Sequence, residues 1–128
     1  MILQQRERFH QLHPVKLLTD WGTAALAGYL LWLRQPLAAV VVGFVPSILV
    51  TAVFLSGRLD RGLERIASRP VAQAVAQNLS AGINTLRFAG LAISWAGCSF
   101  QQAWWIPTGV LVIAGAWWFA WRRGVAQA

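Results

Sequence analysis

The chain has 128 residues, of which 57% are hydrophobic and 12% are charged, so its length fits one domain and its composition lies outside the ordinary soluble range. Its net charge of +7 is typical of nucleic-acid-binding proteins. That class needs basic residues gathered on one accessible face, whereas here they separate hydrophobic blocks, so we expect no nucleic-acid partner. A single cysteine excludes an intramolecular disulfide framework and a multi-cysteine metal site.

The apolar residues lie in four blocks, at 17–33, 36–56, 83–100 and 104–121. Each block has about the length that a helix needs to cross a hydrocarbon core of about 30 Å. A soluble all-α protein is the alternative, but its helices would show polar faces at a 3.6-residue period. Residues 37–55 contain no charged residue and no Asn, Gln or His. The sequence therefore predicts an all-α integral membrane protein, with residues 1–128 forming a single transmembrane domain of four membrane-spanning helices in two hairpins.

The basic residues indicate how these helices are oriented. Ten of the eleven Lys and Arg residues lie before the first block, between the second and third, at the start of the third, or after the fourth. Arg34 alone lies on the other side. Because cytoplasmic loops are enriched in Lys and Arg, both termini and the segment 57–82 are predicted to be cytoplasmic. The Arg-rich and Ala-rich composition suits a multi-pass protein of a bacterial inner membrane.

Tryptophan gives an independent indication, because its amphipathic ring prefers the membrane interface. Trp21 and Trp32 bracket the first block. A soluble core can also hold several tryptophans, but it would not place them at both ends of two blocks. The fourth block begins with two tryptophans and ends with three, namely Trp104, Trp105, Trp117, Trp118 and Trp121.

The cytoplasmic segment 57–82 has apolar residues at helical spacing on both sides of Pro70, which predicts two amphipathic helices. If they continue the second and third membrane helices, they project into the cytoplasm as an antiparallel hairpin, and we favour this arrangement. In the alternative, the segment folds back into the interfacial plane, with a break at Gly57.

A row of arginines follows one face of the first amphipathic stretch. Each basic residue near an anionic surface contributes about 1 kcal/mol to binding, so the row can contact anionic lipid headgroups. The favoured interpretation is that these arginines only fix the topology. The row consists of Arg58, Arg61, Arg65 and Arg69.

Small residues recur every four positions along the second and third membrane helices. In lipid, such rows let helix backbones approach closely, either within one chain or between subunits. Cys98 is expected to be a packing residue of this kind, or to form a disulfide across a dimer if the outer side is oxidising. The rows are Ala39, Gly43, Ser47 and Thr51, and Gly90, Ser94 and Cys98.

Asp20 and Arg87 are two ionisable residues inside the apolar blocks, each about one turn from the cytoplasmic end. Pairing lowers the cost of a charge at that depth. We therefore predict an ion pair between them, which makes the first and third membrane helices neighbours. In the alternatives, Asp20 caps the first helix, or both side chains reach the headgroups separately.

Catalytic and metal-binding sets are not evident. His10 and His13 could share a helical face, but two imidazoles do not make a metal site. Cys98 would need a general base within hydrogen-bond reach, and both histidines are expected across the membrane from it. An enzyme acting on lipid through His10, His13 and Asp20 is a minor alternative. We expect no catalytic residue, no metal and no cofactor.

These features favour a non-catalytic assembly or accessory protein of the lipid bilayer, acting as a homo-oligomer or as a subunit of a larger membrane complex. The alternative is a small oligomeric transporter or channel. Transport proteins usually place an ionisable residue near the middle of the membrane, and none is evident near the middle of any block.

Overall fold

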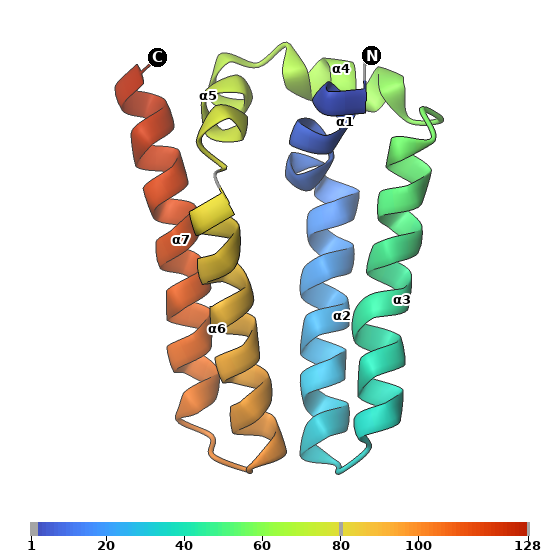
Figure 1. Cartoon of the computed structure of the whole chain (residues 1–128), viewed down its shortest axis with the longest axis vertical. Helices are drawn as coiled ribbons and strands as arrows, with labels where there is room; N and C mark the ends of the chain where they lie inside the picture. Colours follow the sequence, from blue (N-terminus) through green and yellow to red (C-terminus); the bar gives the residue numbers. More distant parts are fainter. Residues whose placement is uncertain (1–2, 80, 128) are drawn as a thin grey trace.

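The computed structural model describes residues 3–79 and 81–127, and this part of the chain is helical, with no strand. The predicted all-α fold class is therefore confirmed. Figure 1 shows four long helices, with the shorter ones gathered over one end. The elements are α1 (Leu3–Phe9), the short 3₁₀ helix η1 (His10–Leu12), α2 (Pro14–Trp32), α3 (Pro36–Leu55), α4 (Asp60–Ala67), α5 (Pro70–Asn78), α6 (Ala81–Ser99) and α7 (Trp105–Gln127).

The four long helices form two antiparallel hairpins, α2 with α3 and α6 with α7, which stand side by side because α2 also packs against α6 (Figure 1). Both α2 and α3 begin with a proline, which suits the first helical position because an N–H there would have no helical partner. The turns within the hairpins place Arg34 and Gln101 at positive φ, 61° and 56°. The helix bounds lie within a few residues of the predicted blocks, apart from the longer end of α7 at Gln127.

Most of the large apolar side chains on these helices face outward. Leu18, Leu37 and Leu111 are 76%, 79% and 71% exposed. In contrast, the largest side chains that are fully buried are Phe54 and Leu63. A water-soluble monomer rarely exposes such continuous apolar surface.

Among the described helices, α3 is the one that is long and apolar enough, by length and composition alone, to cross a membrane. It has 20 residues and an apolar stretch of mean hydropathy 2.5. Only 11% of that stretch is buried inside the chain, so α3 does not resemble the core helix of a soluble protein.

The segment after α3 differs from the projecting hairpin that the sequence favoured. α3 ends at Leu55, and Gly57 has a left-handed φ of +82°, which glycine adopts at little cost. The chain therefore turns, and α4 lies across the end of the row (Figure 1). The projecting hairpin is wrong for this helix because Gly57 breaks it, as the folded-back alternative requires.

An ion pair holds α4 near α1. The Nη2 and Nε atoms of Arg6 donate to the two carboxylate oxygens of Asp60 at 2.7 and 2.9 Å, and Arg6 Nη1 donates to the Leu55 carbonyl at 3.3 Å. The hydrogen bonds from Arg6 lower the pKa of the Asp60 carboxyl. Arg6 therefore makes hydrogen bonds on both sides of the turn at Gly57, to Leu55 before it and to Asp60 after it.

Helix α5 lies beyond the start of α6 and packs against α7 (Figure 1). A Cβ added at Gly124 of α7 would lie 2.9 Å from the Ala74 carbonyl carbon, so the two helices touch closely. Because α5 ends at Asn78 and α6 begins at Ala81, they are two helices where the sequence predicted one continuous helix.

Small residues set the separation of the long helices within the chain. A Cβ added at Gly90 would lie 2.6 Å from the Gly109 carbonyl oxygen, so α6 and α7 meet backbone to backbone. A Cβ at Gly43 would lie 3.2 Å from Ala27 Cβ, which brings α3 close to α2. The small-residue rows thus make contacts inside one chain, the first of the two alternatives.

We predict that Gly57→Ala destabilises the fold. The left-handed conformation costs an L-residue about 1–2 kcal/mol, and the new Cβ would lie 2.7 Å from Arg6 Nη2. The free energy of unfolding in detergent should fall by at least that amount.

Gly115→Ala is the matched control, because a Cβ at Gly115 has no neighbour within 4 Å and alanine favours the helix by roughly 0.5–1 kcal/mol. Equal stabilities of the two variants would contradict the assigned role of Gly57.

Candidate functional site

A groove of about 950 Å³ runs between the two hairpins and is lined by all four long helices. Its two parts differ in chemistry. One part, near the α1 end, is lined by polar side chains, namely His10, Gln11, Lys16, Asp20, Ser47, Thr51, Asn84 and Arg87. The remainder is largely apolar, with Trp32, Phe44, Trp95, Ile106, Val110 and Ile113 among its lining residues.

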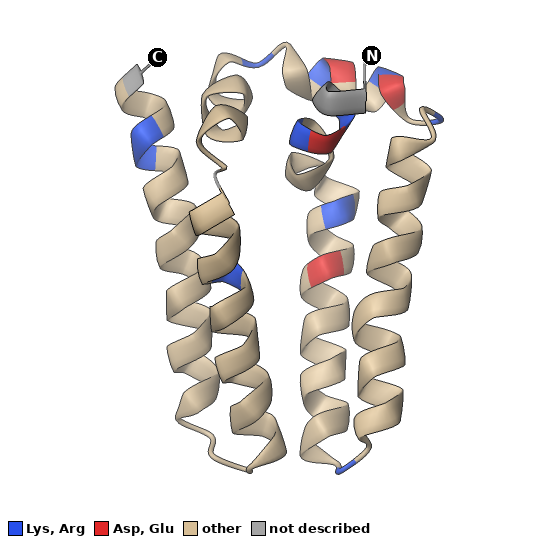
Figure 2. Cartoon of the chain, in the orientation of Figure 1, with Lys and Arg blue, Asp and Glu red and all other residues tan. Residues whose placement is uncertain are grey.

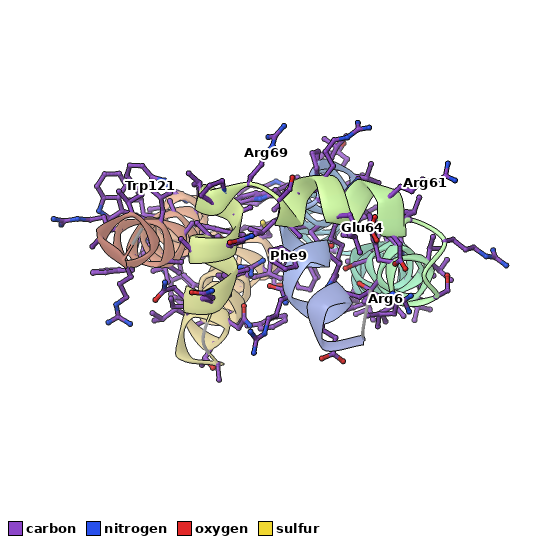
Figure 3. The ribbon with its side chains drawn as sticks, turned by 90° about the horizontal axis from the view of Figure 1, so that it is seen from above. Arg6, Phe9, Arg61, Glu64, Arg69 and Trp121 are labelled. Atoms are coloured by element: carbon purple, nitrogen blue, oxygen red, sulfur yellow. The ribbon has the colours of Figure 1, made fainter. Side chains whose placement is uncertain are left out.

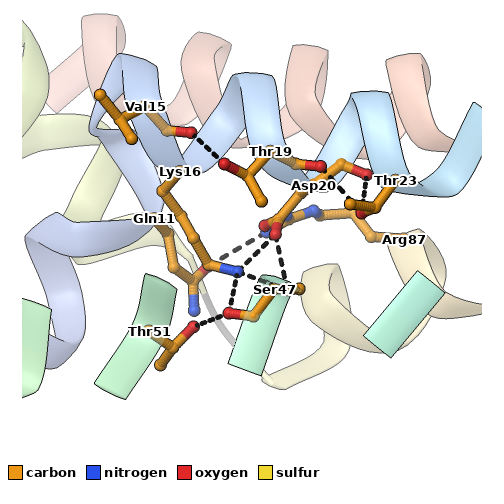
Figure 4. Close-up of polar contacts among 9 residues, drawn as sticks. All are labelled: Gln11, Val15, Lys16, Thr19, Asp20, Thr23, Ser47, Thr51 and Arg87. Carbon is orange, nitrogen blue, oxygen red and sulfur yellow. Dashed lines mark hydrogen bonds and ion pairs between the residues drawn. The ribbon is translucent and has the colours of Figure 1, made fainter. Parts of the chain in front are cut away.

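In the polar part, Lys16 and Asp20 of α2 form a network with Ser47 of α3 (Figure 4). The Lys16 ammonium pairs with the Asp20 carboxylate one turn later and donates to Ser47 Oγ at 2.6 Å. Ser47 Oγ in turn donates to Asp20 Oδ1 at 2.7 Å. Lys16 is 5% exposed, and a buried ammonium is tolerated only when it is paired and hydrogen-bonded. The network therefore joins α2 to α3.

Arg87 of α6 reaches the same end of the groove but has neutral partners. Its Nη1 donates to Gln11 Oε1 and to Asn84 Oδ1, both at 3.1 Å. The guanidinium carbon lies 4.6 Å from the centre of the Trp117 ring, a cation–π contact. Within the described residues, no carboxylate lies within ion-pair distance of Arg87.

The direct Asp20–Arg87 ion pair predicted from the sequence is not formed. Lys16 reaches Asp20 from the same helix, so no approach between helices is required. The expected neighbours α2 and α6 do pack together, and the Trp95 indole N–H of α6 donates to the Ala24 carbonyl of α2 at 3.1 Å.

The capping alternative for Asp20 is also wrong, because α2 begins at Pro14 and its cap is His13. His13 Nδ1 accepts a hydrogen bond from the Val15 backbone N–H at 3.2 Å. His10, 8% exposed, donates through Nδ1 to the Arg6 carbonyl at 3.0 Å. Burial lowers the pKa of both histidines. Both histidines thus have structural roles at the start of α2.

Of the remaining predicted residues, Thr51 belongs to the polar part of the groove, whereas Cys98 and the arginine row lie outside that part. Cys98 is buried, and its Sγ would lie 3.3 Å from a Cβ added at Gly28 of α2, so it packs α6 against α2. Thr51 donates to the Ser47 carbonyl at 2.8 Å. None of the arginine row lines the groove, and Figure 3 shows Arg61 and Arg69 pointing outward from the helices. All four of its members, Arg58, Arg61, Arg65 and Arg69, are exposed.

Sequence reasoning missed Lys16, which it counted only as a topology signal. The spacing of Lys16 and Asp20 at i and i+4 is that of a helical ion pair, and it could have been recognised. The contact between Arg87 and Trp117 had no such signal, because it depends on how α6 packs against α7.

We predict that Lys16→Gln and Asp20→Asn are strongly non-additive. Because they are bonded partners, a double-mutant cycle in detergent should give an interaction free energy of about 0.5–3 kcal/mol. The matched cycle of Asp20→Asn with Arg87→Gln should give a smaller value, because no direct bond joins that pair. A larger interaction free energy in the second cycle would instead support the Asp20–Arg87 ion pair that the sequence predicted.

The groove thus presents two kinds of surface to a ligand. The Arg87 guanidinium, which has no carboxylate within ion-pair distance among the described residues, can bind an anion, and the apolar wall can contact a hydrocarbon chain. Within the described residues, no three His, Cys, Asp or Glu side chains are grouped to hold a metal ion. No protein family, curated protein or solved structure matches this chain, so its function has to be inferred from its own residues and geometry.

Proposed function

We propose that the chain is a multi-pass membrane protein in which α2, α3, α6 and α7 cross a bilayer, with both termini and the α4–α5 segment in the cytoplasm. Its support is the outward-facing apolar surface of these helices. Long helices of 19 to 23 residues extend ~28–35 Å at ~1.5 Å per residue, enough for a hydrocarbon core of ~30 Å. A bacterial inner membrane suits the composition.

The placement of charge supports the same orientation. Figure 2 shows the charged residues concentrated toward the α4 end of the helices, with Arg34 at the opposite end in the α2–α3 turn. Basic residues favour the cytoplasmic side. The exposed arginines of α4 would then lie at the level of anionic headgroups, where each contributes about 1 kcal/mol to attraction.

The function that we propose is non-catalytic assembly, with a second copy or with a larger membrane protein. The observation that carries it is the open row of helices: α3 and α7 stand at its two ends (Figures 1 and 3) and do not close a bundle. α3 packs mainly against α2 and touches α6 through Phe44 and Trp95, and α7 packs against α6 and α5, so the outer faces of both end helices are left available. Because Gly43 and Gly90 already pack within the chain, a partner would contact the outer faces of α3 or α7.

The membrane arrangement predicts the outcome of reporter fusions. Fusions near Arg34 and Gln101 should report the outer side, and fusions near Ser68 and after the C-terminus should report the cytoplasm. A protein that remains in the supernatant after cell lysis without detergent, or an external signal at Ser68, would refute the arrangement.

Assembly predicts that the protein purified in mild detergent is larger than one chain. Crosslinking in intact membranes, followed by mass spectrometry, should give links from exposed positions on α3 or α7 to a second copy or to another membrane protein. Recovery of a lone monomer, with no partner after crosslinking, would contradict this proposal.

The polar part of the groove supports one other function, a small oligomeric transporter or channel. Ionisable residues that face a cavity inside a membrane often mark a transport pathway, and Lys16, Asp20 and Arg87 all line this groove. Flux of ions or dyes through liposomes carrying the protein, above that of empty vesicles, would replace assembly by transport as the proposed function.

A further inference from the structure

We propose that the groove between the hairpins binds one anionic phospholipid, with its phosphate at Arg87 and its acyl chains along the apolar wall. This inference rests on the proposed membrane placement, but it does not depend on which partner the protein assembles with. It concerns a site distinct from the exposed arginine row of α4.

The positive charge at the polar end of the groove indicates an anionic headgroup. Lys16 is matched by Asp20, so Arg87 supplies one positive charge that is not neutralised at the polar end of the groove. A guanidinium has five N–H donors, and the hydrogen bonds within the described residues use only Nη1 of Arg87. Arg87 is only partly buried and lines the groove, and no hydrogen bond within the described residues uses its Nε or Nη2. These donors match the bidentate geometry of a phosphate oxygen pair.

The apolar lining of the rest of the groove indicates that the ligand has hydrocarbon tails. Beyond the polar cluster, its walls are apolar, with Phe44 and Trp95 in edge-to-face contact at 5.6 Å between ring centres. A ligand that is anionic at one end and apolar along its length would satisfy both parts. Since Arg87 lies near the cytoplasmic end of α6 in the proposed orientation, the headgroup would lie at the level of the leaflet that carries anionic lipids.

The size of the groove suits a small amphiphile. Its volume of about 950 Å³ falls within the range of small-molecule sites, ~300–1,000 Å³. The charge at its polar end then favours an anionic lipid over an uncharged ligand.

The test is native mass spectrometry of the detergent-purified full chain, titrated with phosphatidylglycerol or phosphatidylcholine. The wild type should bind one phosphatidylglycerol about tenfold more tightly than phosphatidylcholine. Arg87→Gln should remove most of that preference, and Arg87→Lys, which keeps the charge without the planar fork, should retain part of it. Arg123→Gln, at an exposed position on α7, should leave the preference unchanged.

A second pair of variants tests the apolar wall without touching Arg87. Val110→Trp, which fills the groove, should weaken binding of both lipids severalfold, whereas the adjacent Leu111→Trp, at a position that does not line the groove, should have no effect. Thermal unfolding should first show that each variant is folded.

An unchanged preference in folded Arg87→Gln and Arg87→Lys would overturn the inference. So would a preference abolished only by neutralising Arg58, Arg61, Arg65 and Arg69, since it would place the lipid on α4. Either result leaves the reporter topology intact, so it can be told apart from failure of the membrane placement.

Discussion

The four long helices carry more apolar surface than the chain can bury, and the rest of the structure depends on this constraint. In a row of two hairpins, α3 packs mainly against α2, and the main long neighbour of α7 is α6 (Figure 1). Leu37, on the outermost helix α3, is 79% exposed. Water would penalise such a surface at about 25 cal/mol per Å², whereas hydrocarbon would not. The open shape is therefore consistent with a protein whose surroundings are apolar on both sides of the row.

In the proposed membrane placement, apolar surroundings also change which interactions hold the helices together. Where lipid is as apolar as leucine, close backbone packing and hydrogen bonds between helices provide the stabilisation. Each contact between long helices has one or both: Gly90 against Gly109 for α6 and α7, the Lys16–Asp20–Ser47 network for α2 and α3, and the Trp95 indole on the Ala24 carbonyl between the hairpins. The third contact is narrow, and it leaves room for the groove.

Features set by local sequence could be predicted, and features set by competition between neighbours could not. The apolar blocks located the long helices to within a few residues, apart from the end of α7, because length and hydropathy act locally. The partner of Asp20 was misassigned because Lys16 competes with Arg87 for the same carboxylate, and the outcome depends on which side chain reaches it. Gly57 was predicted to break the helix only in the less favoured, folded-back arrangement. Its effect depends on the ion pair between Arg6 and Asp60, which the sequence did not indicate. The groove itself had no sequence signal, because residues of four separate helices line it.

The central claim is that hydrocarbon surrounds the long helices and water surrounds α4 and the hairpin turns. Spin labels at single cysteines in a Cys98→Ser background, reconstituted in liposomes, test it by their collision rates with oxygen and with a water-soluble nickel complex. Labels at Leu49 and Leu111, both exposed on long helices, should meet oxygen often and nickel rarely. Labels at Arg61 and Gln101 should show the reverse. If nickel reached Leu111 as readily as Arg61, the long helices would lie in water and the membrane placement would be wrong.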